Sequence, residues 1–128
     1  MMIEARELYL YATNDVRLYD QQREPIERNL QRKFDKGVYD SEKAATLWLR
    51  FADNAAKKYY DECYAGVKFN FSSGRVFKWF HMFNIDARRE VATLMESEHH
   101  SEMKVNRDYD ETIDWFTSGV PYEEYYNG

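Results

Sequence analysis

The chain has 128 residues, a formal net charge of −5, 44% hydrophobic residues and 17% aromatic residues, which suits one domain with a buried core. No apolar run reaches the roughly 18 residues that span a bilayer, and residues 1–4 lack the basic start and apolar stretch of a signal peptide. We therefore expect a soluble cytoplasmic protein with no membrane partner.

The first predicted elements lie before residue 37. Residues 8–11 form a short apolar run that fits a helix or a strand, and we favour a helix. Thr13 or Asn14 then predicts the cap of a helix that runs to Lys36. Pro25 disfavours helical geometry in the residue before it, so either this helix kinks or a second helix begins with Pro25 in its first turn. The residues expected on the apolar face are Val16, Tyr19, Ile26, Leu30 and Phe34.

The clearest helical pattern lies between Asp40 and Gly66. Asp40 or Ser41 can cap its start, and Gly66 can end it. Because the connection at residues 37–39 is short, this central helix is expected to lie antiparallel to the preceding one. Three charged pairs four residues apart predict an exposed opposite face: Asp53 with Lys57, Lys57 with Asp61, and Lys58 with Glu62. The apolar positions recur at helical spacing: Ala45, Trp48, Ala52, Ala55, Tyr59 and Cys63. Cys63, the single cysteine, is expected to be buried on this face.

The chain after Gly66 has two open interpretations. In residues 67–71 and 75–79 apolar and polar side chains alternate, and Ser-Ser-Gly between them is typical of a turn. This pattern is typical of a β-hairpin. The same region also fits a short helix with Val76, Phe77, Trp79, Phe80 and Phe83 on one side. Asn84 or Asp86 then predicts the cap of a helix to about His100. The residues expected on its inner face are Ala87, Val91, Leu94 and Met95.

Residues 101–128 carry the whole charge excess, with seven acidic and two basic side chains. They also contain six aromatic residues, more than a disordered acidic tail usually has. We expect a short helix from about Asp110 that docks Trp115 and Phe116 on the bundle. The residues expected to contact a partner are Asp108, Asp110, Glu111, Asp114, Tyr122, Glu123, Glu124, Tyr125 and Tyr126.

A basic stretch offers a second kind of surface. Arg28, Arg32 and Lys36 stand four apart on one helix face, with Lys33 beside them. Such a face can bind the phosphates of a nucleic acid. Acidic neighbours such as Glu27 lower the positive charge of this face. We therefore favour the interpretation that it is a solvated surface.

Catalytic and metal chemistry have little support in the sequence. Glu96, His99 and His100 contain one Glu-x-x-His pair, whereas carboxylate-bridged metal sites take two such pairs and further glutamates. No phosphate-binding glycine loop and no Gly-x-Ser-x-Gly motif occur. We therefore expect no metal, no cofactor and no enzymatic activity.

Several short motifs occur in a fixed order. They are residues 14–19 (NDVRLY), 25–30 (PIERNL), 37–40 (GVYD), 45–48 (ATLW) and 55–59 (AAKKY), followed by Met82-Phe83 and by Arg88, Val91 and Ala92. Together they resemble the signature of short proteins of no assigned function found in phage genomes and prokaryotic metagenomes. The resemblance covers roughly residues 10–95 and implies a phage-type origin, with the host cytoplasm as the place of action. It implies no activity, ligand or site residue.

These observations predict an all-α bundle of four or five helices with at most one short β-hairpin near residues 67–79. Residues 1–100 form the bundle domain, and residues 101–128 form a partly docked acidic aromatic segment. The expected function is a non-catalytic accessory protein that binds a macromolecular partner, such as a host-directed inhibitor that uses the acidic aromatic surface. The alternatives are a nucleic-acid-binding regulator that uses the basic face between Arg28 and Lys36, and a self-assembling virion or structural component.

Overall fold

The computed structural model describes residues 3–64 and 78–119, with side chains described as far as Asp108. These residues are helical apart from short connections and contain no strand, which confirms the predicted all-α fold. Most of the possible hairpin, residues 67–77, lies outside the described residues, and Trp79 is helical. The chain divides into two compact units, residues 1–96 and 97–128.

The first unit begins with two helices that Asp15 separates. Helix α1 (Ala5–Asn14) ends where the Asp15 backbone is extended, and α2 (Val16–Leu18) follows. Asp15 Oδ1 accepts a hydrogen bond from Leu18 N at 2.9 Å and so caps α2. The predicted cap at Thr13 or Asn14 is therefore wrong. Thr13 lies inside α1, where its hydroxyl donates to the carbonyl oxygen of Tyr9.

A wide turn accommodates Pro25. The π-helix η1 (Tyr19–Arg23) leads into α3 (Glu24–Asp35), which holds Pro25 in its first turn. Glu24 keeps a helical backbone and donates its N–H to Tyr19 O, five residues back. The structure thus combines the two alternatives, because α3 begins at the proline and a π-turn joins it to the preceding helix. Leu30 is buried, as predicted, whereas Val16 and Tyr19 are exposed, contrary to prediction; Leu18, which was not predicted, is also buried.

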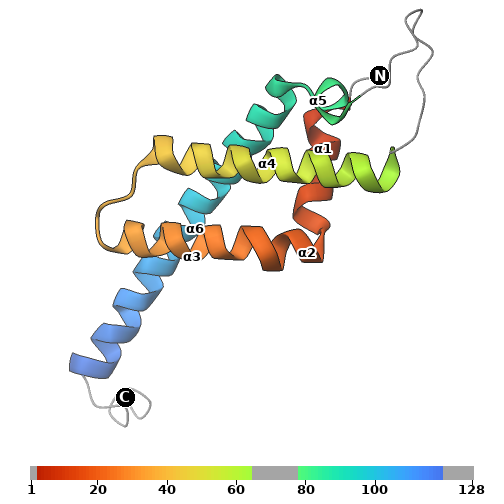
Figure 1. The fold of residues 1–128 in the computed structure, drawn as a ribbon. Helices are drawn as coiled ribbons and strands as arrows, with labels where there is room; N and C mark the ends of the chain where they lie inside the picture. The colour runs from red at the N-terminus through yellow and green to blue at the C-terminus, as the bar shows by residue number, and fades with distance from the viewer. Residues whose placement is uncertain (1–2, 65–77, 120–128) are drawn as a thin grey trace, which may run out of the picture. The chain divides into compact units, whose positions relative to one another are not determined.

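A short connection turns the chain into α4 (Ser41–Cys63). Gly37 has φ of +74°, a value that favours glycine, and Val38 N donates to Lys33 O at 2.9 Å. Asp40 caps α4, since its side chain accepts from the N–H groups of Glu42 and Lys43. Figure 1 shows α3 and α4 side by side and antiparallel, as predicted.

The buried face of α4 differs from the predicted one at its two ends. Ala45 and Cys63 are exposed. Periodicity indicates that a face is apolar, but the neighbouring helices decide where along the helix that face is covered. The buried residues of α4 are Ala44, Trp48, Phe51, Ala52, Ala55 and Ala56.

Two further helices complete the described chain. Ile3 N donates to Met82 O at 2.8 Å and joins the N-terminal residues to α5 (Trp79–Met82). Asn84 Oδ1 accepts from Ala87 N and caps α6 (Ile85–Gly119). Within the first unit α6 buries Ala87, Val91, Ala92 and Met95, whereas Leu94 is 39% exposed, contrary to prediction.

Helix α6 also differs from its predicted length. It does not end near His100 before a separate short helix but continues without a break to Gly119. Among the described helices, none is both long enough and apolar enough to cross a membrane.

Candidate functional site

The acidic residues predicted to contact a partner belong to the second unit. Asp108 is exposed, and its carboxylate lies 3.7 Å from the guanidinium of Arg107. Asp110, Glu111 and Asp114 lie on the helical backbone of α6. The remaining predicted residues lie outside the described chain: Tyr122, Glu123, Glu124, Tyr125 and Tyr126.

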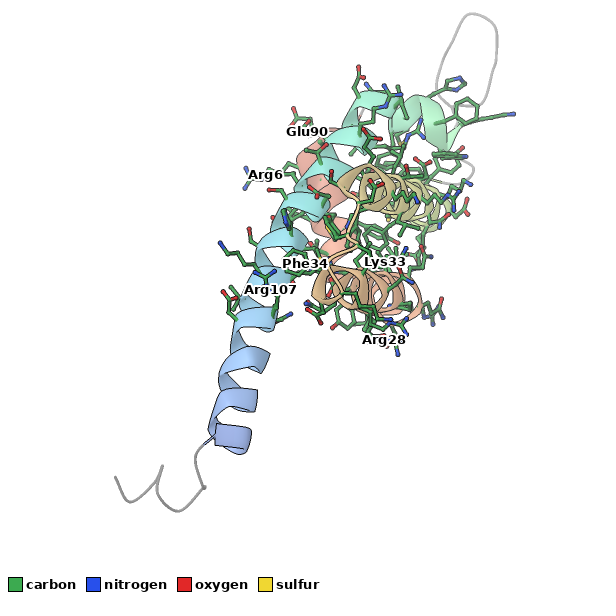
Figure 2. All side chains as sticks on the ribbon, turned by 90° about the vertical axis from the view of Figure 1, so that its left-hand side faces the viewer. Arg6, Arg28, Lys33, Phe34, Glu90 and Arg107 are labelled. Atoms are coloured by element: carbon green, nitrogen blue, oxygen red, sulfur yellow. The ribbon has the colours of Figure 1, made fainter. Side chains whose placement is uncertain are left out.

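The basic residues of α3 do not form one face. Arg28, Arg32 and Lys36 are exposed at helical spacing, but Lys33 is half-buried. Arg28 and Lys33 stand five positions apart, so they lie on different sides of α3, as the labels in Figure 2 show. Arg28 Nε is also 2.8 Å from Glu24 Oε1. The structure therefore brings together three of the four predicted basic residues, and a carboxylate neutralises one of them.

A polar network connects α1 and α2 to α4. The Lys58 ammonium lies 2.8 Å from Asp15 Oδ2 and also bonds the Glu62 carboxylate, which confirms the predicted pair between Lys58 and Glu62. Tyr11 donates from its hydroxyl to Glu62 Oε2 at 2.7 Å. The ring centroids of Tyr11 and Tyr59 are 4.4 Å apart. Lys58 thus joins α4 to Tyr11 of α1 and to Asp15, the cap of α2.

The network keeps its groups in fixed protonation states. The hydrogen bond from Lys58 lowers the pKa of Asp15, and the bonds to Asp15 and Glu62 raise the pKa of Lys58. Burial and the bond to Glu62 raise the pKa of Tyr11 to about 12. Lys58 is therefore charged and Tyr11 neutral at physiological pH, which suits a network that stabilises the packing of α1 and α2 on α4.

A second polar cluster lies between α4, α5 and α6. The predicted partner of Asp53 was Lys57, but Asp53 pairs with Arg88. Trp79 has two cations over its ring, with Arg88 Cζ at 4.8 Å and Lys57 Nζ at 5.0 Å from the ring centroid. Such contacts are typical of cation–π stabilisation. These contacts of Trp79 join α5 to α4 and α6.

Other candidate residues make structural contacts. Glu96 Oε1 accepts a hydrogen bond from the Tyr39 hydroxyl at 2.7 Å, and burial, with a further contribution from this bond, raises the pKa of Tyr39. His81 is exposed, and its Nδ1 accepts from Lys78 N at 3.4 Å at the start of α5. The exposed position of Cys63 at the end of α4 corrects the expectation that it is a core residue.

An open depression lies beside the polar network. Its volume is about 420 Å³, and its lining residues are Glu7, Leu10, Tyr11, Asn14, Asp15 and Tyr59. Four of these follow one face of α1 at helical spacing, and Tyr59 comes from α4. The sequence alone did not predict this site. The spacing along α1 was a visible signal, but nothing in the sequence connects it with Tyr59.

Comparisons with models of known protein families, with curated proteins and with solved structures find no match. Function must therefore be inferred from the residues and their geometry.

Proposed function

We propose that the chain is a non-catalytic accessory protein that binds a macromolecular partner through its acidic, aromatic C-terminal segment. The observation that carries this proposal is the continuity of α6. The first compact unit ends at Glu96, but α6 runs on to Gly119 in the second unit.

The described part of the second unit consists of this single helix. Most helices gain their stability by packing an apolar face. Val105, Tyr109, Ile113 and Phe116 recur at steps of four, four and three, which is the spacing of one helix face. Val105 is 66% exposed. This pattern supports a helix that is completed by binding.

The charge of the segment supports a basic partner surface. Residues 97–119 contain six acidic and two basic side chains, a net charge of −4. Asp110 and Asp114 stand four apart and therefore share one helix face by spacing. A surface of one sign steers association with a partner of the opposite sign and raises the association rate. The same charge disfavours pairing of this segment with a second copy.

The first unit supports a scaffold role. Its half-buried charged groups, such as Lys58 and Arg88, bond to carboxylates of the same unit and connect its helices. The resemblance to phage proteins favours a host protein as the partner. Inhibition would then follow if the acidic segment occupied a basic groove that otherwise binds nucleic acid.

The test compares two variants with the same change in charge. In the first, Asp110→Asn, Glu111→Gln and Asp114→Asn neutralise the helix. In the control, Asp20→Asn, Asp61→Asn and Glu90→Gln neutralise three exposed acids of the first unit. Affinity capture from host-cell extract with the unmodified chain identifies the partner, and surface plasmon resonance measures the rates.

We expect the helix variant to associate about tenfold more slowly and the control to match the unmodified chain. Added salt should slow association more than it speeds dissociation. Deletion of residues 120–128 should weaken binding without changing the melting temperature. Equal affinities for the two charge variants would overturn the proposal.

A further inference from the structure

The depression beside α1 combines aromatic, apolar and acidic lining. Tyr11 and Tyr59 supply two rings, Leu10 is 46% exposed, and Glu7 and Asp15 supply two carboxylates. No basic residue belongs to the lining. Its volume of about 420 Å³ falls within the range of roughly 300–1,000 Å³ found for ligand pockets.

Of the two carboxylates, Asp15 pairs with a basic side chain and Glu7, among the described residues, does not. Asp15 forms an ion pair with Lys58, which also pairs with Glu62. Glu7 forms no ion pair with any basic side chain in the described parts of the chain. Burial and the hydrogen bond with Tyr64 raise the pKa of Tyr59 to about 12, and the Glu7 carboxylate makes a smaller contribution to this rise. The site therefore retains an uncompensated negative charge next to aromatic rings.

The structure already holds a cation against one of these rings. Lys58 Nζ lies 5.7 Å from the centroid of Tyr11. Aromatic faces with a nearby carboxylate recognise guanidinium and ammonium groups, and arginine is the more frequent partner because its planar group stacks on rings and bonds carboxylates through two N–H groups. The apolar edge at Leu10 suits the methylene stem of such a side chain.

We propose that this depression binds the guanidinium group of an arginine side chain presented by a protein partner. Glu7 accepts its hydrogen bonds, the edges of the Tyr11 and Tyr59 rings in the lining contact it, and Leu10 contacts its stem. The site goes beyond the proposed function, because it lies in the first unit and does not depend on the C-terminal segment. Two acidic surfaces on one chain would select the same kind of basic partner.

The test uses the full chain labelled with nitrogen-15 and two small probes. N-acetyl-arginine amide carries the guanidinium, and N-acetyl-citrulline amide is its neutral counterpart of nearly equal shape. Amide chemical shifts are followed during titration. We expect the arginine probe to shift the amides of Leu10, Tyr11 and Asn14 saturably, with an affinity about fivefold or more above that of the citrulline probe.

Two variants and a control test the role of charge. Glu7→Gln should weaken binding of the arginine probe by about threefold or more, and Asn14→Asp, which adds a carboxylate to the lining, should strengthen it by a similar factor. Glu90→Gln removes an exposed acid of α6 and should leave binding unchanged. A gain in affinity cannot come from loss of folding. Equal shifts with both probes, or equal effects of Glu7→Gln and Glu90→Gln, would overturn the proposal.

Discussion

Arg88 of α6 donates a hydrogen bond from Nη1 to Oδ1 of Asp53 on α4 at 2.7 Å. Only 11% of the Arg88 side chain is exposed. Its Nε donates to Phe83 O at 2.9 Å, and its guanidinium lies over the ring of Trp79. One side chain therefore fixes the start of α6 to both α4 and α5.

Replacement of Arg88 by methionine should lower the free energy of unfolding by about 1.5–3 kcal/mol, since it removes a charged hydrogen bond and leaves Asp53 partly buried. Arg89 is the matched control, because it is the next residue and is exposed. Arg89→Met should change stability by less than about 0.5 kcal/mol. Denaturant titration measures both variants, and equal losses would show that the contact with Asp53 is not stabilising.

The Lys58 network should make stability depend on pH. The pKa of Asp15 is lowered in the folded chain, chiefly by the hydrogen bond from Lys58. A carboxyl of this kind contributes stability above its unfolded pKa of about 3.9 and loses that contribution as pH falls through its folded value. The pKa of Lys58 is raised, so its contribution is complete below its unfolded pKa of about 10.4 and is lost as pH rises through its folded value.

Lys58→Met should therefore flatten both the acidic and the strongly alkaline ends of the stability profile. Lys43→Met, at an exposed position of the same helix, should keep the shape of the unmodified profile. Unfolding by denaturant at a series of pH values gives the measurement. An acid loss of the same size in Lys58→Met would assign the pH dependence to other carboxyls.

Trp48 occupies the centre of the bundle, with no exposed surface and an edge-to-face contact with Phe51 at 5.7 Å between ring centroids. Trp48→Ala should cost about 3–5 kcal/mol, as expected when a buried aromatic site is emptied. The exposed Arg50 lies two residues further on, and Arg50→Ala should cost less than about 0.5 kcal/mol. Similar midpoints in urea for the two variants would contradict the central position of α4.

Binding of nucleic acid through α3 should be weak. Lys33 is half-buried and lies on a different side of α3 from Arg28, and Glu24 pairs with Arg28. Three phosphate contacts at most would give a slope of log affinity against log salt of about −2.7 for duplex DNA, from about −0.9 per contact. Fluorescence anisotropy with labelled duplex tests this. Micromolar, salt-sensitive binding that disappears when the four basic residues become glutamine would favour a nucleic-acid-binding regulator instead.

The sequence by itself determined where most helices form. Helical periodicity located α4, and short-range signals located the cap at Asp40 and the turn at Gly37, because both depend on interactions within a few residues. The same signals predicted the antiparallel arrangement of α3 and α4, since a short connection leaves few alternatives. They were less reliable at Asp15, where several polar residues in a row could each cap a helix.

Only the tertiary structure decided which faces are buried and which charges pair. Ala44 is buried and Ala45 exposed although both are apolar, because burial requires a neighbouring helix. Asp53 pairs with Arg88, 35 residues away, rather than with Lys57. An exposed pair four residues apart contributes only about 0.2–0.5 kcal/mol, so a partly buried, geometrically fixed partner prevails over it. The depression beside α1 arises for the same reason: its ring from α4 meets the face of α1 only when the helices pack.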